Sequence, residues 1–249
     1  MVLADPVFSD RDDRLTRQQQ IRMRDECNSE TKVSGITPQN QIDLAERLVS
    51  SDAQTRSGIR LERLCGTRRE AMGIQHLVPS ARVALDFGAS LKTAVDPDLR
   101  HYRIIHFATH GLAPDSHPEL SGVVLSLFNR QGQSQEGYLG LPLVYNLDLP
   151  VEMVVLSACE TGLGETIRGE GLIGLTRGFM YAGSPRVVAS YWKVREGATE
   201  ELMKRFYINM FQKRLRPSAA LSAAQASMWS DQHWPMSDWA GFAFFGEPR

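Results

Sequence analysis

Two side chains capable of nucleophilic catalysis each follow an apolar run of the sequence. His110 comes shortly after residues 102–108, and Cys159 comes shortly after residues 151–157. A thiolate that attacks a carbonyl carbon needs a neighbouring acid–base group and backbone N–H groups directed at the developing oxyanion. His110 could supply the first, and the amides of Gly111 and Cys159 could supply the second, because glycine lets a backbone approach a substrate closely. The spacing alone is more typical of a packed histidine and an inert buried cysteine than of a catalytic pair.

Strands that alternate with helices are the elements that would bring these residues together. Apolar and β-branched runs predict strands over residues 2–8, 83–85, 102–108, 123–127, 151–157, 186–192 and 240–245. Helical spacing and end signals predict helices over residues 38–49, 67–76, 89–94, 170–181, 199–213 and 218–229. Thr67 and Glu70 have the spacing of a capping box at the start of the second helix.

This order of elements predicts an α/β fold with a mostly parallel sheet and helices on both faces. In such sheets ligands bind outside the carboxyl ends of the strands, where loops leave the sheet. His110 and Cys159 both follow predicted strands at that edge. The fold class therefore favours a site that both residues share.

Composition narrows the class of protein. The chain has 249 residues, of which 42% are hydrophobic, enough to bury a core as one large domain or two small ones. Lys and Arg number 28 against 29 for Asp and Glu, so the formal charge of −1 disfavours a nucleic acid or an acidic membrane as partner. No apolar stretch approaches the ~18 residues of a membrane helix, and the start lacks the order of a signal peptide. Three scattered cysteines predict free thiols and a cytoplasmic location.

The first 60 residues are the least informative. The strand over residues 2–8 starts with no turn or cap before it, which predicts that the N-terminal part of the domain is missing. Residues 9–60 form a polar segment with one amphipathic helix, and its mixed charges are typical of a solvated surface. We assign this segment no function.

Longer strings of sequence carry a family resemblance. HFATHG at residues 106–111 and LSACETGLGE at residues 156–165 closely resemble the CHAT family, a group of caspase-like domains in the clan that includes caspases and separases. The resemblance continues through residues 169–194 and 198–207 to WAGFAFFGEP at residues 239–248. Weaker similarities, LADPVF and GTRREA, lie upstream. The match therefore touches nearly all of residues 1–249.

The resemblance implies a cysteine endopeptidase that cleaves a protein or peptide substrate. By motif position His110 is the catalytic histidine, Cys159 is the nucleophile, and the amides of Gly111 and Cys159 form the oxyanion hole. This chemistry requires no metal or organic cofactor. Family members often carry tetratricopeptide repeats upstream that sense a partner, and analogy implies a cytoplasmic, bacterial-type enzyme of a defence or cell-death pathway.

Substrate specificity depends on residues after the Trp-x-Val motif. Family members often have paired acidic residues there, whereas this chain has Arg195 and Glu196 after Trp192-Lys193-Val194. Glu196 could receive a basic P1 side chain, and Arg195 could favour an acidic one or be a surface residue. Trp192 and Asp115 are further candidates for substrate contact.

Of three other interpretations, the spacing excludes one, a zinc site, and two stay open. His106 and His110 have an H-x-x-x-H spacing, but four residues along a strand span ~13 Å, too far for one zinc ion. A catalytically silent regulatory or interaction domain with the same fold is the main alternative. A hydrolase or transferase of small acyl substrates that uses the same thiol is the second.

Overall fold

The computed structural model describes residues 1–9, 12, 14, 61–113, 118–131, 133, 135–157, 170–231 and 234–248. The helix predicted over residues 38–49 and two of the predicted site residues, Asp115 and Cys159, lie outside these ranges.

The larger sheet in the described part of the chain has six strands. Their order is β2-β1-β3-β7-β8-β9, and every neighbouring pair is parallel except β8 and β9. The strands are Val2–Ala4 (β1), Val83–Leu85 (β2), Ile104–Ala108 (β3), Met153–Leu156 (β7), Arg186–Ser190 (β8) and Phe242–Gly246 (β9). The predicted mostly parallel sheet is confirmed, and the C-terminal run forms its antiparallel edge strand.

A second, smaller sheet is antiparallel and has the order β4-β5-β6. It consists of Gly111–Leu112 (β4), Gly122–Val124 (β5) and Tyr138–Gly140 (β6). The strand predicted over residues 123–127 therefore belongs to this sheet and is shorter than expected. The pattern gave no indication of β4 and β6, because two or three residues are too few to show an alternation.

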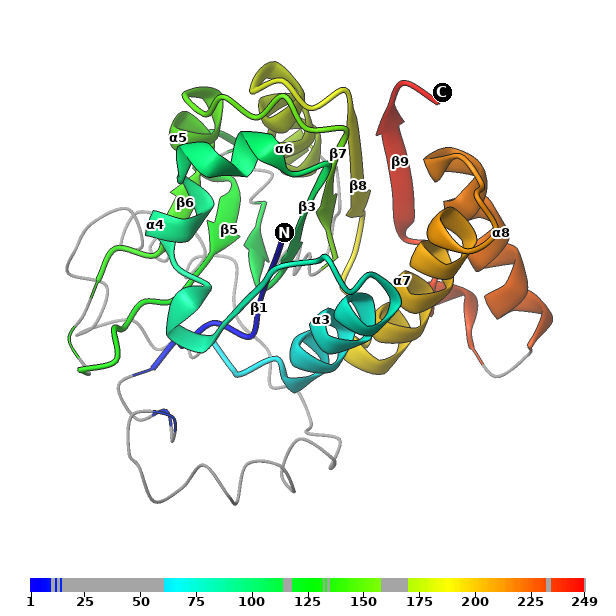
Figure 1. Cartoon of the computed structure of the whole chain (residues 1–249), viewed down its shortest axis with the longest axis horizontal. Helices are drawn as coiled ribbons and strands as arrows, with labels where there is room; N and C mark the ends of the chain where they lie inside the picture. Colours follow the sequence, from blue (N-terminus) through cyan, green and yellow to red (C-terminus); the bar gives the residue numbers. More distant parts are fainter. Residues whose placement is uncertain are drawn as a thin grey trace.

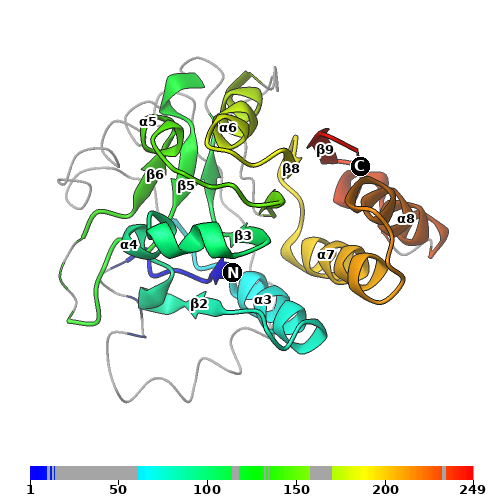
Figure 2. The ribbon, with the colours of Figure 1, turned by 45° about the horizontal axis from the view of Figure 1, so that its top comes forward.

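Helices cover both faces of the larger sheet (Figures 1 and 2). They are Cys65–Leu77 (α3), Leu91–Ala94 (α4), Leu141–Tyr145 (α5), Glu170–Tyr181 (α6), Glu196–Phe211 (α7) and Pro217–Ser230 (α8). In Figure 1, α4, α5 and α6 lie on the same side as the smaller sheet, and α3, α7 and α8 lie on the other side. Short 3₁₀ helices span Asp86–Gly88, Pro97–His101, Pro118–Leu120 and Met236–Asp238. The described helices include none long and apolar enough to cross a membrane.

The alternation of side chains along the strands divides the core into two layers. In β7, Val154 and Leu156 pack into the cluster that includes Leu175 of α6. Met153 and Val155 pack into the other cluster, which includes Leu202 of α7. All four strand residues are almost fully buried, as expected for a central parallel strand covered on both faces.

The start of α3 differs from the prediction. The helix begins at Cys65, its N-cap residue Leu64 makes no side-chain cap, and Thr67 and Glu70 form no capping box. The Thr67 hydroxyl instead donates to the carbonyl of Leu64 and accepts from the amide of Asp5, at 2.7 and 3.1 Å. The capping box fails because the helix starts two residues earlier than expected, which leaves Glu70 to bind a buried partner across the core.

Candidate functional site

His110 lies just beyond the end of β3, and its imidazole is almost fully buried. Its Nε2 atom is 2.7 Å from the carbonyl oxygen of Glu62. The ring also lies against Phe8, with the ring centroids 4.9 Å apart. A carbonyl oxygen can only accept, so Nε2 carries the hydrogen and Nδ1 is the nitrogen that can exchange a proton.

The segment that contains Cys159 begins and ends beside the segment that carries His110. At its start, the amide of Ser157 donates to the carbonyl of Phe107 at 3.0 Å, which continues the pairing of β3 with β7. At its end, Gly171 in the first turn of α6 packs so closely that an added Cβ would lie 2.7 Å from the carbonyl carbon of Ala113. The structure thus brings both flanks of residues 158–169 to the two sides of His110, while Cys159 itself lies outside the described residues.

Gly111 begins β4 at the edge of the smaller sheet. The amide of Val124 donates to the carbonyl of His110 at 2.8 Å, so these two residues form a hydrogen-bonded antiparallel pair. Gly111 pairs with Val123 in the next position, where the N–H groups of an antiparallel pair point away from each other. The Gly111 amide is therefore directed away from β5.

Glu196, the first residue of α7, also lies at this end of the sheet. Its Oε2 accepts a hydrogen bond from the amide of Gly66 in α3, and its carboxylate interacts electrostatically with His110. Burial raises the pKa of Glu196 above its usual 4.5, against the opposing effects of the Gly66 amide, Arg69 and His110. His110 and Glu196 therefore lie close together, although they belong to separate motifs of the sequence.

Arg195 faces a different partner. Its guanidinium binds the buried carboxylate of Asp238, with Nε 3.0 Å from Oδ2, and lies over the ring of Trp234. Trp192 donates from Nε1 to the carbonyl of Ser237 at 2.6 Å and is partly buried. Glu196 thus contacts α3 and interacts with His110, whereas Arg195 is bound to Asp238.

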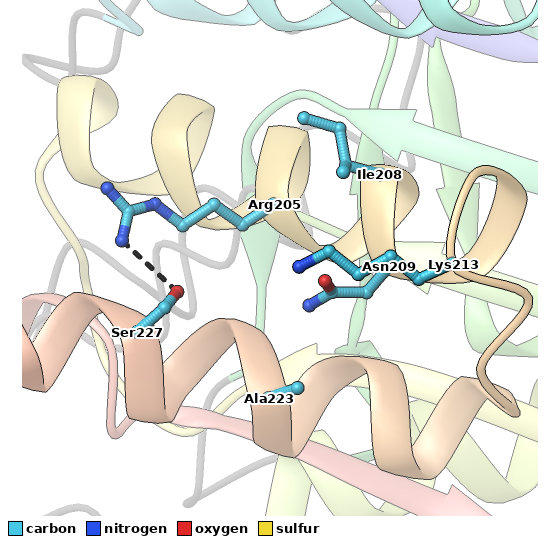
Figure 3. Close-up of a pocket in the computed structure, with 6 residues that line it drawn as sticks. All are labelled: Arg205, Ile208, Asn209, Lys213, Ala223 and Ser227. Atoms are coloured by element: carbon cyan, nitrogen blue, oxygen red, sulfur yellow. Dashed lines mark hydrogen bonds between the residues drawn. The ribbon is translucent and has the colours of Figure 1, made fainter.

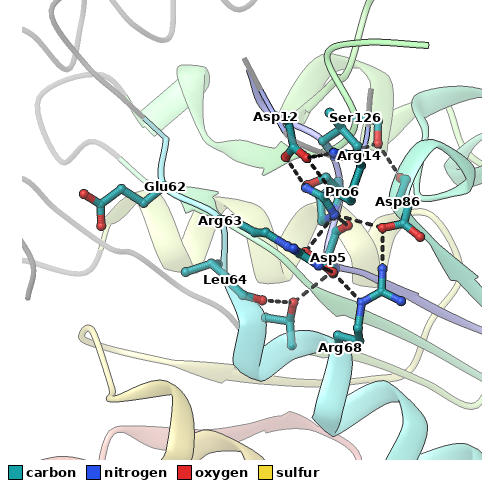
Figure 4. Close-up of polar contacts among 12 residues, drawn as sticks. Asp5, Pro6, Asp12, Arg14, Glu62, Arg63, Leu64, Arg68, Asp86 and Ser126 are labelled. Atoms are coloured by element: carbon teal, nitrogen blue, oxygen red, sulfur yellow. Dashed lines mark hydrogen bonds and ion pairs between the residues drawn. The ribbon is translucent and has the colours of Figure 1, made fainter. Parts of the chain in front are cut away.

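A buried ion cluster fixes the backbone beside the site (Figure 4). Asp5 directly follows β1, is fully buried, and binds Arg14, Arg63 and Arg68 at 2.9, 2.6 and 2.7 Å. Arg14 also binds Asp86 at 3.0 Å. Because Arg63 immediately follows Glu62, the cluster holds the chain that presents the carbonyl to His110.

The prediction of a free thiol at Cys65 is wrong. Cys65 is disulfide-bonded, and its partner lies outside the described residues. Cys65 is the first residue of α3 and precedes Gly66, whose amide binds Glu196. The disulfide is therefore attached next to the candidate site.

A cavity of about 240 Å³ lies elsewhere, between α7 and α8 (Figure 3). Arg205, which lines it, is nine residues from Glu196, or about 14 Å along the helix axis. Arg205 donates to Ser227 at 3.1 Å and is paired with Glu201 and Asp231. Because none of the sequence-predicted site residues is in its lining, this cavity is not the candidate site.

Sequence reasoning missed several residues that contact His110 or His106. Glu62 acts through its backbone carbonyl, so no side-chain pattern could have identified it. Phe8 was assigned only to a strand, and Glu70 was interpreted as a helix cap. The weak similarity around GTRREA was the one indication that Glu70 has a further role.

Comparison with known proteins extends over nearly the whole chain. The model of the CHAT domain matches residues 6–247. Tetratricopeptide repeat protein 28 of Homo sapiens is 34% identical over 113 residues, which is 45% of this chain and 4% of that protein. Tetratricopeptide repeat protein 28 of Mus musculus is 33% identical over 102 residues, 41% of this chain and 4% of that protein. The chain thus spans a small fraction of the length of these curated relatives.

Proposed function

Because the chain belongs to the CHAT domain family, which is related to caspase-like peptidases, we propose that it is a cysteine endopeptidase with a dyad of His110 and Cys159. One observation carries the proposal. Both flanks of the segment that contains Cys159 are fixed beside His110, through Ser157 on one side and Gly171 on the other. This anchoring supports the proposed dyad, because Cys159 follows the fixed residue Ser157 by only two positions.

The reaction follows from these roles. Nδ1 of His110 takes the proton of the Cys159 thiol. The thiolate then attacks the carbonyl carbon of the scissile peptide bond, and the carbonyl oxygen becomes an oxyanion. His110 then gives a proton to the leaving amine, the C–N bond breaks, and an acyl-enzyme remains. Water attacks this thioester, the acid product leaves, and the thiol is regenerated. The hydrogen bond from Nε2 to Glu62 supports Nδ1 as the atom that moves the proton.

Gly111 is the proposed donor to the oxyanion, together with the amide of Cys159. Its N–H group points away from β5, as expected of an amide reserved for a substrate. It also lacks a side chain that would obstruct the substrate carbonyl.

Glu196 is the proposed contact for a basic P1 side chain. Its carboxylate is close to His110, and Arg195, the residue that could have favoured an acidic substrate, is bound to Asp238. Trp192 and Asp115 are kept as candidates for substrate contact, without a specified role.

Peptide cleavage by single-residue variants tests the dyad. We expect Cys159→Ala and His110→Ala each to abolish cleavage of a peptide library after reduction, and Cys159→Ala to lower labelling of the reduced chain by a thiol-reactive probe. Cys27→Ala, assayed under the same reducing conditions, is the matched control and should leave cleavage unchanged. Undiminished cleavage by Cys159→Ala would contradict the mechanism.

The two alternatives have distinct outcomes in the same assay. A silent regulatory domain would cleave nothing, and its Cys159 would react with iodoacetamide no faster than Cys27 after reduction. A small-acyl hydrolase would turn over esters but no peptides. The relatives are named as tetratricopeptide repeat proteins, which supports a tetratricopeptide-repeat region as regulatory partner. The role in defence or cell death is proposed by family analogy alone.

A further inference from the structure

Four buried polar side chains form a network on the α3 and α7 side of the larger sheet. The His106 ring on β3 is fully buried, with Nδ1 2.9 Å from the hydroxyl of Tyr207 on α7. Its Nε2 is 2.7 Å from Oε1 of Glu70 on α3 and 3.0 Å from the hydroxyl of Ser157 at the end of β7. The other three residues are each at most 3% exposed.

The direction of these hydrogen bonds follows from the groups involved. Burial raises the pKa of Tyr207 well above 10, as does the charge of Glu70, so the phenol keeps its hydrogen. Among the contacts of the described residues, Nδ1 of His106 is the acceptor for that hydrogen. The ring hydrogen is then on Nε2, which donates to the Glu70 carboxylate and has the Ser157 oxygen as a second acceptor.

The network lies directly behind the candidate site. His106 precedes His110 by four residues on the same segment, and Ser157 precedes Cys159 by two residues. The amide of Ser157 also donates to Phe107, so both its backbone and its side chain are held by β3. The network therefore connects the strand that leads to the histidine with the strand that leads to the cysteine.

Apolar side chains would fill this space at a lower cost in free energy. Burying polar groups away from water is unfavourable unless each finds a partner, and a fully satisfied network fixes one arrangement more rigidly than apolar packing does. The neighbouring positions on this face of β3 and β7, Ala108, Met153 and Val155, are all apolar. On this face of the two strands, His106 and Ser157 thus stand out as polar among apolar neighbours.

We propose that His106, Glu70 and Tyr207 are positioning residues that hold Ser157 and thereby orient the segment of Cys159 toward His110. This inference rests on the proposed peptidase function, although its readouts include two that need no peptide cleavage. None of the three residues contacts substrate. They act through Ser157.

Tyr207→Phe is the decisive variant, because it removes the hydroxyl and keeps the ring that stacks on Phe211. We expect kcat to fall roughly ten- to a hundredfold with KM unchanged, the loss typical of a reacting group displaced by about 1 Å. Asn209→Ala is the matched control. Asn209 is also buried on α7, and its side chain donates to the carbonyl of Ala220 at 3.1 Å. This hydrogen bond reaches neither β3 nor β7, the two strands that lead to His110 and Cys159. It should lower the melting temperature and leave kcat unchanged.

Two further readouts keep the inference separate from the peptidase proposal. Nitrogen-15 NMR of the unsubstituted chain should find His106 with its hydrogen on Nε2. After reduction, iodoacetamide should alkylate Cys159 more slowly in Tyr207→Phe than in Asn209→Ala, as followed by peptide mass mapping. Should Tyr207→Phe fail to fold, Ser157→Ala takes its place, and Ser157→Thr should restore the rate.

The outcomes are distinguishable. A chain that cleaves no peptide refutes the peptidase proposal alone, and the alkylation rates still decide the positioning role. Equal kcat and alkylation rates in Tyr207→Phe and Asn209→Ala would overturn the positioning role. A hydrogen on Nδ1 of His106 would overturn the network as described.

Discussion

The Nε2 atom of His110 donates a hydrogen bond to the backbone carbonyl of Glu62, over a distance of 2.7 Å. The contact orients the ring and determines which nitrogen carries the hydrogen, yet it uses no side chain of Glu62. The main chain at residue 62 therefore orients the His110 ring, and the ion cluster around Asp5 holds the neighbouring Arg63.

We first expect the side chain of Glu62 to be dispensable. Glu62→Ala should leave kcat/KM within about twofold, because exposed side chains contribute little and the carbonyl remains. Phe8→Ala should lower kcat and the free energy of unfolding, because it removes the ring against His110. Steady-state kinetics and urea unfolding of the two variants measure the contrast. Equal kinetics would mean that Phe8 does not hold the imidazole.

Glu196→Gln should remove a preference for basic P1 residues. The amide oxygen of glutamine can still accept from Gly66, so the fold is kept while the charge is lost. We expect kcat/KM for arginine substrates to fall about tenfold, equivalent to about 1.4 kcal/mol, with little change for neutral substrates. Arg195→Ala is the matched control and should leave selectivity unchanged, since its guanidinium is bound to Asp238. Selectivity that changes only in Arg195→Ala would reverse the assignment.

The pH dependence of that selectivity has a defined sign. Burial raises the pKa of Glu196, so its carboxylate takes up a proton at a higher pH than an exposed glutamate does. Cleavage after basic residues should therefore decline as the pH falls toward this raised pKa, above 4.5. Because the charged form is disfavoured in the fold, this group stabilises the protein less as the pH rises through that pKa. Glu196→Gln should abolish both effects in pH profiles of kcat/KM and of unfolding.

Two glycines of α6 should respond differently to alanine. A Cβ at Gly171 would lie 2.7 Å from the backbone of Ala113, which has no room to move, whereas a Cβ at Gly174 meets only ordinary contacts at 3.7 and 3.8 Å. Gly171→Ala should therefore displace the start of α6 and reduce both kcat and the melting temperature. Gly174→Ala should be neutral or slightly stabilising, since alanine favours helices. Equal effects on kcat would contradict the role of α6 in anchoring the segment of Cys159.

Asp5 should be among the most sensitive charged residues. Asp5→Asn leaves three arginines without their shared buried carboxylate and should cost about 3–5 kcal/mol of unfolding free energy. Arg103→Gln is the matched control, because the pair of Arg103 and Glu152 is exposed and should contribute about 0–1 kcal/mol. Guanidinium unfolding of both variants gives the comparison. A cost for Asp5→Asn no larger than the control would show that the cluster is not a structural anchor.

The disulfide of Cys65 should be visible in a thiol count. The chain has three cysteines, so one disulfide leaves one free thiol. The unfolded, unreduced chain should therefore react with one equivalent of a disulfide reagent. The unfolded, reduced chain should react with three. Three equivalents in both samples would contradict the disulfide. Peptide mapping then identifies the partner of Cys65.

Much of the fold followed from the sequence because its causes are local. The β-branched runs of β3, β7 and β8 predicted a parallel sheet. The helix α6 was predicted at its observed bounds, because its apolar spacing and the glycine two residues after Tyr181 are both visible in the sequence. Elements of two or three residues, such as β4 and β6, left no readable pattern. The candidate pair His110 and Cys159 was predicted from motifs, and the position of His110 at the strand edge agrees with that expectation.

The roles of Glu70, Glu62 and His106 were decided only by the tertiary structure. Local spacing assigned Glu70 to a helix cap, but a partner 36 residues away on β3 binds its carboxylate instead. Glu62 and His110 meet across 48 residues through a backbone atom that is the same in every amino acid. The sequence by itself determined which strands and helices form and which side chains could react, because those depend on neighbours along the chain. Which groups hold the candidate histidine was decided by contacts between distant segments, because burial makes the choice of hydrogen-bond partner a property of the packed core.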